Sequence, residues 1–160
     1  MQAALDLRPV GYLHPDAASL VARVQREYVE RYGSPDESPV DPAVFDPPEG
    51  LFLVGYDALG DPVATGAWRR SSVRALGGAS AVEVKRMFVV SERRGLGFAR
   101  AVLAALESAA VAAGHDVVVL ETGLRQPEAI GLYRSAGYEE IPGFGFYRDA
   151  PLSRCFGKRL

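Results

Sequence analysis

Residues 85–100 of this 160-residue chain read Lys85-Arg86-Met87-Phe88-Val89-Val90-Ser91-Glu92-Arg93-Arg94-Gly95-Leu96-Gly97-Phe98-Ala99-Arg100. The first half predicts an apolar strand, and the second half predicts a basic, glycine-bearing turn that opens a long helix. Unpaired backbone N–H groups and the positive end of the helix dipole coincide at such a turn. Glycine lets a large anion approach the backbone, so the stretch predicts a cradle for a phosphate or pyrophosphate.

The flanking sequence predicts a mixed sheet with helices on both faces. Before the stretch we expect strands over residues 5–12, 51–56, 62–70 and 80–90, a helix from His14-Pro15-Asp16 to Gly33, and a long loop with one helical turn over 33–50. After it we expect a helix over 94–113, a buried strand over 117–120, a helix over 127–136 and a closing antiparallel hairpin over 145–160. A strand, a helix and a strand in succession imply a right-handed crossover and parallel pairing.

Composition narrows the class of protein. The chain is 48% hydrophobic and 24% charged, which fits one soluble globular domain with a real core. Its net charge of −2 argues against a nucleic-acid-binding protein. Cys155 is the only cysteine, which excludes an intrachain disulfide, and nothing resembles a metal-ligand set. We expect no signal peptide and no membrane span, and therefore a cytoplasmic protein.

Three kinds of phosphate site compete for the glycine turn. A P-loop needs Gly-x-x-x-x-Gly-Lys-Ser/Thr, which the chain lacks. A dinucleotide fingerprint would use Gly95 and Gly97, but Arg100 occupies the position of its third glycine, and the motif follows the fourth predicted strand rather than the first. A nicotinamide oxidoreductase is therefore disfavoured.

The third kind of site fits the turn. Arg94-Gly95-Leu96-Gly97-Phe98-Ala99 matches Arg/Gln-x-x-Gly-x-Gly/Ala and resembles the coenzyme A signature of the GNAT N-acetyltransferase superfamily. Residues 82–89 resemble the strand that precedes it. Residues 126–138 resemble a later helix of the family with the pattern Asn-x-x-Ala-x-x-Leu-Tyr-x-x-x-Gly-Phe, where Gln126 replaces the frequent Asn and Tyr138 the frequent Phe. Both motifs stand in the expected order.

This resemblance implies a single GNAT-like domain over residues 1–160, an α/β (α+β mixed) fold whose twisted sheet has about six to seven strands. It implies acetyl-CoA as the cosubstrate. The strand segment would splay from its parallel neighbour, and a backbone N–H near Val89 would polarise the thioester carbonyl. Arginine forks suit the pyrophosphate. The implied cofactor-binding residues are Met87, Phe88, Val89, Arg93, Arg94, Gly95, Leu96, Gly97, Phe98, Ala99, Arg100 and Gln126.

The resemblance also implies catalytic roles for two residues. Tyr133 would be the general acid that protonates the departing coenzyme A thiolate. Glu83 would take a proton from the amine, directly or through water, and a water chain without Glu83 is the alternative. Glu121 and Thr122 end a predicted parallel strand, where ligands gather in open sheets.

The acceptor and the assembly stay open at this level. Residues 27–49 hold seven acids and one base, which would attract a cationic amine or form only a solvated loop, whereas Trp68-Arg69-Arg70 could bind an acceptor carboxylate. A polyamine, an aminoglycoside, an amino acid and a protein lysine all remain candidates. A non-catalytic coenzyme A-binding module is the alternative to an enzyme. Exposed sheet edges would allow a homodimer.

Overall fold

Seven strands form one sheet in the order β1-β2-β3-β4-β5-β7-β6 in the computed structural model, which describes residues 4–160. β4 and β5 pair in parallel, and every other neighbouring pair is antiparallel. The predicted mixed sheet is thereby confirmed. The strands are β1 Asp6–Pro9, β2 Gly50–Tyr56, β3 Pro62–Ser71, β4 Ala81–Val89, β5 Val117–Gly123, β6 Glu139–Ile141 and β7 Ser153–Arg159.

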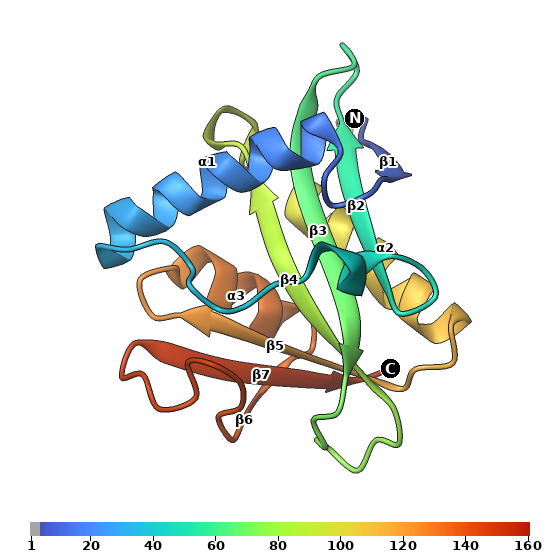
Figure 1. Ribbon diagram of the computed structural model, residues 1–160, viewed down its shortest axis with the longest axis vertical. Coiled ribbons are helices and arrows are strands. Elements are labelled where there is room, and N and C mark those ends of the chain that lie inside the picture. The colour runs from blue at the N-terminus through green and yellow to red at the C-terminus, as the bar shows by residue number, and fades with distance from the viewer. Residues whose placement is uncertain (1–3) are drawn as a thin grey trace.

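Helices cover both faces of the sheet (Figure 1). α1 (Pro15–Tyr32) crosses one face, and α2 (Phe98–Ala112) lies on the other. α3 (Pro127–Ser135) lies beside α2, and the Arg100 guanidinium of α2 donates to the Ser135 hydroxyl of α3 at 2.7 Å. Two short 3₁₀ helices, η1 (Pro42–Phe45) and η2 (Ser91–Arg93), complete the set. Within the described residues, no helix is both long and apolar enough to cross a membrane.

The start and end of α1 follow from the residues that the sequence places there. The His14 ring accepts a hydrogen bond from the Asp16 backbone N–H at 3.1 Å, and Pro15 occupies the first helical position. Gly33 ends the helix in the left-handed conformation with a φ of 84°. Leu20 and Val24 are buried and hold the helix against the sheet.

The predicted start of the long helix and the predicted hairpin at the end of the chain are both wrong. The helix predicted from Arg94 begins at Phe98, because Gly95 and Gly97 adopt φ values of 78° and 82° and form a turn that a right-handed helix cannot contain. The hairpin predicted over residues 145–160 does not form. Its second arm is β7, but its partner arm is β6, which precedes Gly145, and β7 lies between β5 and β6 in the sheet.

β4 and β5 diverge after a short parallel ladder. They pair from Ala81↔Val117 to Val84↔Leu120, and no further. Beyond that point β4 continues to Val89 along β3, whereas β5 continues along β7. The sheet therefore opens into a wedge between the two central strands, as the family resemblance implies.

A β-bulge in β4 lies at the start of this wedge. Ala67 pairs with Lys85 and Thr65 pairs with Phe88, so two residues of β4 oppose Gly66 alone. Arg86 has a φ of 57°, and its carbonyl accepts a hydrogen bond from the buried Thr65 hydroxyl at 2.6 Å. The bulge interrupts the alternation of side chains along β4.

Gly66 lets α2 approach the sheet opposite this bulge. A Cβ at this position would overlap the Val102 and Leu106 side chains of α2. We expect Gly66→Ala to lower the free energy of unfolding by about 1–3 kcal/mol, because the packed helix must shift. Gly131→Ala is the control, since a Cβ at Gly131 in α3 meets no atom within 4 Å, and it should add about 0.5–1 kcal/mol. Urea unfolding measures both, and equal stability of the two variants would contradict the packing argument.

Candidate active site

A cavity of about 320 Å³ lies between β4 and the N-termini of α2 and α3. Apart from Leu96, whose side chain is exposed, every residue that the sequence predicts for cofactor binding lines this cavity. Tyr133 lines it as well. The lining residues are Glu27, Met87, Phe88, Val89, Arg93, Arg94, Gly95, Gly97, Phe98, Ala99, Arg100, Gln126, Glu128, Ala129, Leu132 and Tyr133.

The N-terminus of α2 gives this cavity backbone donors. The first intrahelical hydrogen bond runs from the Ala101 N–H to the Gly97 carbonyl at 3.1 Å. The N–H groups of Phe98, Ala99 and Arg100 therefore have no partner within the helix and point out of its first turn. Together with the helix dipole, they make this end of the cavity suitable for an anion.

Protein groups hold the two arginines of the turn, Arg93 and Arg94. Arg94 contacts the Glu27 carboxylate at 2.8 Å and donates to the Val89 carbonyl at 3.0 Å. The Arg93 side chain pairs with Asp57 in the β2–β3 hairpin at 3.3 Å. Arg94 and its partner Glu27 both line the cavity, which places a bidentate phosphate ligand and a competing carboxylate at the same wall.

Tyr133 is the buried phenol of this cavity. It lies on α3 with its ring against Tyr138 at a centroid distance of 5.7 Å. Burial, reinforced by the nearby Tyr28, raises the pKa of Tyr133 well above its usual value, so the group is a neutral phenol at neutral pH. Its hydroxyl makes no hydrogen bond to any other described residue, and it is available to donate to a ligand in the cavity.

A second cavity of about 290 Å³ adjoins the first, and Gln126 lines both. It lies between the end of α1, the end of β5 and the loop that precedes β7. Glu121 and Thr122, predicted as ligand contacts at a strand end, line it. The lining residues are Tyr28, Tyr32, Ser34, Pro35, Asp36, Glu121, Thr122, Gly123, Gln126, Tyr147, Ala150, Pro151, Leu152 and Ser153.

Glu121 is the carboxyl group of this second cavity with an unusual proton affinity. Burial raises its pKa to about 7; the positive charge of Lys85 opposes this shift, and the negative charges of Glu83 and Asp36 add to it. The thiol of the buried Cys155 lies 3.9 Å from a Glu121 oxygen. A carboxyl group with this pKa can exchange a proton near neutral pH.

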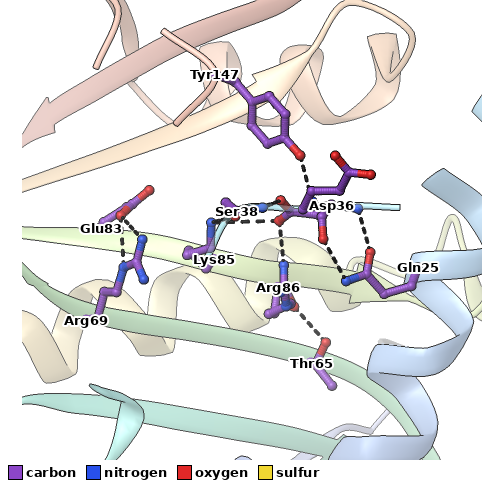
Figure 2. A network of polar contacts seen from close by, with 10 residues as sticks. Gln25, Asp36, Ser38, Thr65, Arg69, Glu83, Lys85, Arg86 and Tyr147 are labelled. Atoms are coloured by element: carbon purple, nitrogen blue, oxygen red, sulfur yellow. Dashed lines mark hydrogen bonds and ion pairs between the residues drawn. The ribbon is translucent and has the colours of Figure 1, made fainter. Parts of the chain in front are cut away.

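Glu83 is not brought into either cavity. Both the Nε and Nη2 atoms of Arg69 lie 3.0 Å from its Oε1, and its side chain is 12% exposed. The pair lies across the antiparallel β3–β4 ladder, at the register Arg69↔Glu83. Figure 2 shows this pair apart from the cluster of polar residues around Asp36.

Asp36 is the centre of that cluster, which the sequence did not single out (Figure 2). Its carboxylate lies 2.7 Å from the Arg86 guanidinium and 3.8 Å from the Lys85 ammonium. The bulge lets these two consecutive side chains reach the same group. Burial would raise the pKa of Asp36, but the Ser38 hydroxyl, Lys85 and Arg86 lower it to about 2. Gln25 of α1 binds the Asp36 backbone at both its N–H and its carbonyl.

Tyr147 was also missed. Its hydroxyl accepts a hydrogen bond from the Glu37 N–H at 2.7 Å and so connects the α1–β2 loop with the loop before β7. Tyr28 and Tyr32 of α1 also line the second cavity. Their spacing of four along α1 could have indicated a shared face, but not that this face borders a cavity.

Cys155 and the two histidines do not form a nucleophilic set. Burial raises the pKa of the Cys155 thiol. His14 caps α1, and the Nδ1 atom of His115 lies 2.8 Å from the Ser80 hydroxyl.

Known proteins are similar to this chain in sequence and in fold. The model of the acetyltransferase (GNAT) family matches residues 17–138. A Klebsiella pneumoniae protein described as an acyl-CoA N-acyltransferase is 27% identical over 98% of this chain and 97% of its own, with a TM-score of 0.76. A GNAT-family acetyltransferase from Staphylococcus aureus shares the fold at 18% identity, with a TM-score of 0.74 over 98% of this chain and 99% of its own.

A curated relative is also similar in sequence. The "IAA acetyltransferase" of Azospirillum brasilense is 44% identical over 78 residues, which are 49% of this chain and 51% of the relative. The match thus spans about half the length of that relative. The fold is the one that these acyltransferases share. With most of its length matched by the family model, the chain belongs to the acetyltransferase (GNAT) family.

The Asp36–Arg86 pair offers a test of what holds the second cavity together. Asp36→Asn leaves the guanidinium of Arg86, which is 6% exposed, without its carboxylate, so we expect a loss of about 3–5 kcal/mol in the free energy of unfolding. Asp6→Asn is the control, because the Asp6–Arg8 pair is exposed and should contribute under about 1 kcal/mol. Urea unfolding at pH 7 compares the two.

The contribution of Asp36 to the free energy of unfolding should depend on pH in a defined direction. The pKa of Asp36 falls from 3.8 to about 2 on folding, so its stabilising effect is complete above about pH 4 and disappears as the pH falls toward 2. A constant difference between wild type and Asp36→Asn over that range would contradict the assignment.

Proposed function

We propose that this protein transfers an acetyl group from acetyl-CoA to a primary amine in a single ternary complex. The observation that carries the proposal is the meeting of two cavities in the β4–β5 wedge, one with an anion cradle and the other with a titratable carboxyl group. The acetyltransferase names of the family and of the Azospirillum relative support acetyl as the transferred group.

In this proposal each part of coenzyme A is matched to residues of the first cavity whose chemistry suits it. The pyrophosphate would accept hydrogen bonds from the Phe98–Arg100 backbone and from Arg94, which would then exchange its Glu27 contact for phosphate oxygens. The pantetheine arm would run along residues 87–89 of β4. The Val90 N–H donates to the Val63 carbonyl in β3, so by alternation the Val89 N–H faces the wedge, where it can stabilise the oxyanion.

The reaction then follows in two bond changes. The neutral amine attacks the thioester carbonyl and forms a C–N bond and a tetrahedral oxyanion. Collapse of this intermediate breaks the C–S bond and releases a thiolate, and the attacking nitrogen, which is positively charged after the attack, loses its extra proton to solvent. The Tyr133 phenol donates its proton to that thiolate, and the phenolate recovers a proton from solvent. A group with a strongly raised pKa stays protonated until the thiolate forms.

Glu121 is assigned as the base that takes the proton from the incoming ammonium. It lines the second cavity, which this proposal assigns to the amine acceptor. Its pKa of about 7 suits a base near neutral pH. Glu83, the base implied by the family resemblance, is held by Arg69 and lines neither cavity. Its contribution in this proposal is its negative charge, which raises the pKa of Glu121.

Tyr133→Phe separates an enzyme from a non-catalytic coenzyme A-binding module. We expect kcat to fall by about 10²–10⁴-fold, because the thiolate loses its acid, while the ring still packs. Coenzyme A should still raise the melting temperature, by a stabilisation of about 2.7 kcal/mol at 100 times its dissociation constant, and NAD should not. Tyr138→Phe, which loses only its 2.7 Å bond to Glu107, is the control and should keep its turnover. Full turnover in Tyr133→Phe would overturn the role of this residue.

The pH profile distinguishes the two candidate bases. For wild type, kcat/KM should rise with pH through about 7, as Glu121 loses its proton. Glu121→Gln should remove this step and lower the plateau by about 10²–10⁴-fold. Glu83→Gln should keep the step but move it to lower pH, because one negative charge beside Glu121 is gone. If Glu83→Gln removes the step and Glu121→Gln does not, Glu83 is the base.

A further inference from the structure

We propose that the acceptor is a small amine with one ammonium group, a flat apolar body and no carboxylate, such as a 2-arylethylamine. This inference rests on the proposed function, and it narrows the acceptor classes that the sequence leaves open. The supporting observations are the residues that line the second cavity, the charged groups in and around it, and the hydrogen bonds that join the loops on its two sides.

The walls favour a flat apolar body. Three tyrosine rings, of Tyr28, Tyr32 and Tyr147, line the cavity together with apolar side chains, among them Pro35 and Leu152. The rings of Tyr28 and Tyr32 lie 6.5 Å apart and are inclined to each other by 59°, an arrangement that offers ring faces and edges to a ligand. Burial raises the pKa of Tyr28 to about 12, so this phenol stays neutral.

The charges favour a single ammonium group. The lining contains two carboxylates, of Asp36 and Glu121, and no lysine, arginine or histidine. The charge of Asp36 is already balanced by Arg86 and Lys85. Among the described residues, no cationic side chain lies within 4 Å of the Glu121 carboxylate. One unpaired carboxylate matches one ammonium, whereas a polyamine would bring further charges without partners.

The same charges disfavour an acceptor that carries a carboxylate. The basic strand end that the sequence offered for such a group is occupied elsewhere, since Arg69 pairs with Glu83 and Arg70 with Glu49. Neither arginine lines the cavity. An amino acid would therefore place its carboxylate near Glu121 with no cation in the wall to balance it.

Hydrogen bonds across the cavity favour a small molecule over a peptide. The Glu37 N–H donates to the Tyr147 hydroxyl and joins the two loops on opposite sides of the cavity. At the end of α1, Arg31 and Arg125 each donate to the other's carbonyl at 2.8 Å, which fastens the helix to the β5–α3 connection. With these ties in place, a cavity of about 290 Å³ is at the small end of ligand sites.

Binding to the full chain saturated with coenzyme A tests this class without requiring turnover. Calorimetry compares 2-phenylethylamine with L-phenylalanine, which has the same body and an added carboxylate, with spermidine, and with a tetrapeptide containing one lysine. We expect 2-phenylethylamine to bind at least about tenfold more tightly than each of the others, which is about 1.4 kcal/mol. Equal or reversed affinities, or no binding of 2-phenylethylamine, would overturn the proposal.

Two variants show whether the named contacts select the ligand. Glu121→Gln should weaken 2-phenylethylamine binding by about tenfold or more, whereas Glu140→Gln, on an exposed residue of β6, should not change it. Tyr147→Phe removes the tie to Glu37 and should improve binding of the lysine tetrapeptide relative to wild type. Unchanged peptide affinity would remove the loop tie from the explanation of size selection.

Turnover separates this inference from the proposed function. If 2-phenylethylamine binds as expected but thiol release from acetyl-CoA is absent with every amine, the acceptor site stands and the transferase proposal fails. If thiol is released with spermidine or the peptide while 2-phenylethylamine binds no more tightly than they do, the protein is a transferase and the acceptor class proposed here is wrong.

Discussion

The left-handed turn of the backbone at Arg86 is the constraint on which both halves of the site depend. It adds one residue to β4 opposite Gly66, which turns the rest of the strand away from its parallel neighbour and lets Lys85 and Arg86 reach the same carboxylate. A non-glycine residue with left-handed backbone conformation is strained. The Thr65 hydroxyl and the Asp36 carboxylate supply the contacts that hold Arg86 in it. One local irregularity thus opens the wedge and anchors the loop that borders the second cavity.

The wedge frees one edge of a strand in the middle of the sheet. A continuous parallel ladder would pair every backbone group of β4 and leave no edge for an extended ligand. Here the ladder stops at Val84↔Leu120, and the freed edge of β4 leads directly to the N-terminus of α2. The end of β5, with Glu121, lies on the other side of the gap. The fold therefore brings an anion cradle and a titratable carboxyl group to opposite sides of one opening.

The sequence contains most of this architecture, because its signals are local. The glycine pair, the proline at the start of α1 and the apolar strands each depend on neighbouring residues, and the structure agrees with them. Most of the lining of the first cavity was also predictable, since many of its residues are nearly contiguous from Met87 to Arg100. The tail hairpin was not, because the partner of β7 lies before a glycine-rich loop and only tertiary pairing selects it.

The second cavity could not be predicted from the sequence for a related reason. Its wall combines α1, the loop at Asp36, the end of β5 and the loop at Tyr147, which are far apart in sequence. The seven acids over residues 27–49 left two alternatives open, a site that attracts a cationic amine or a solvated loop, and the structure gives these acids separate contacts. Glu27 binds Arg94, Asp41 caps η1 and Glu49 pairs with Arg70. Of these acids only Asp36 lines the second cavity, and its charge is already balanced.

The pKa values of two carboxyl groups in one cavity are consequently shifted in opposite directions. Asp36 and Glu121 are both partly buried, and burial alone would raise the pKa of each. Asp36 receives two cations and a hydroxyl and stays ionised at any pH at which the protein would work. Glu121 receives the more distant attraction of Lys85, opposed by two negative neighbours, and titrates near neutrality. The difference comes from which carboxylate the bulge places beside Lys85 and Arg86, so the same feature that opens the sheet also leaves Glu121 as the group that can accept a proton.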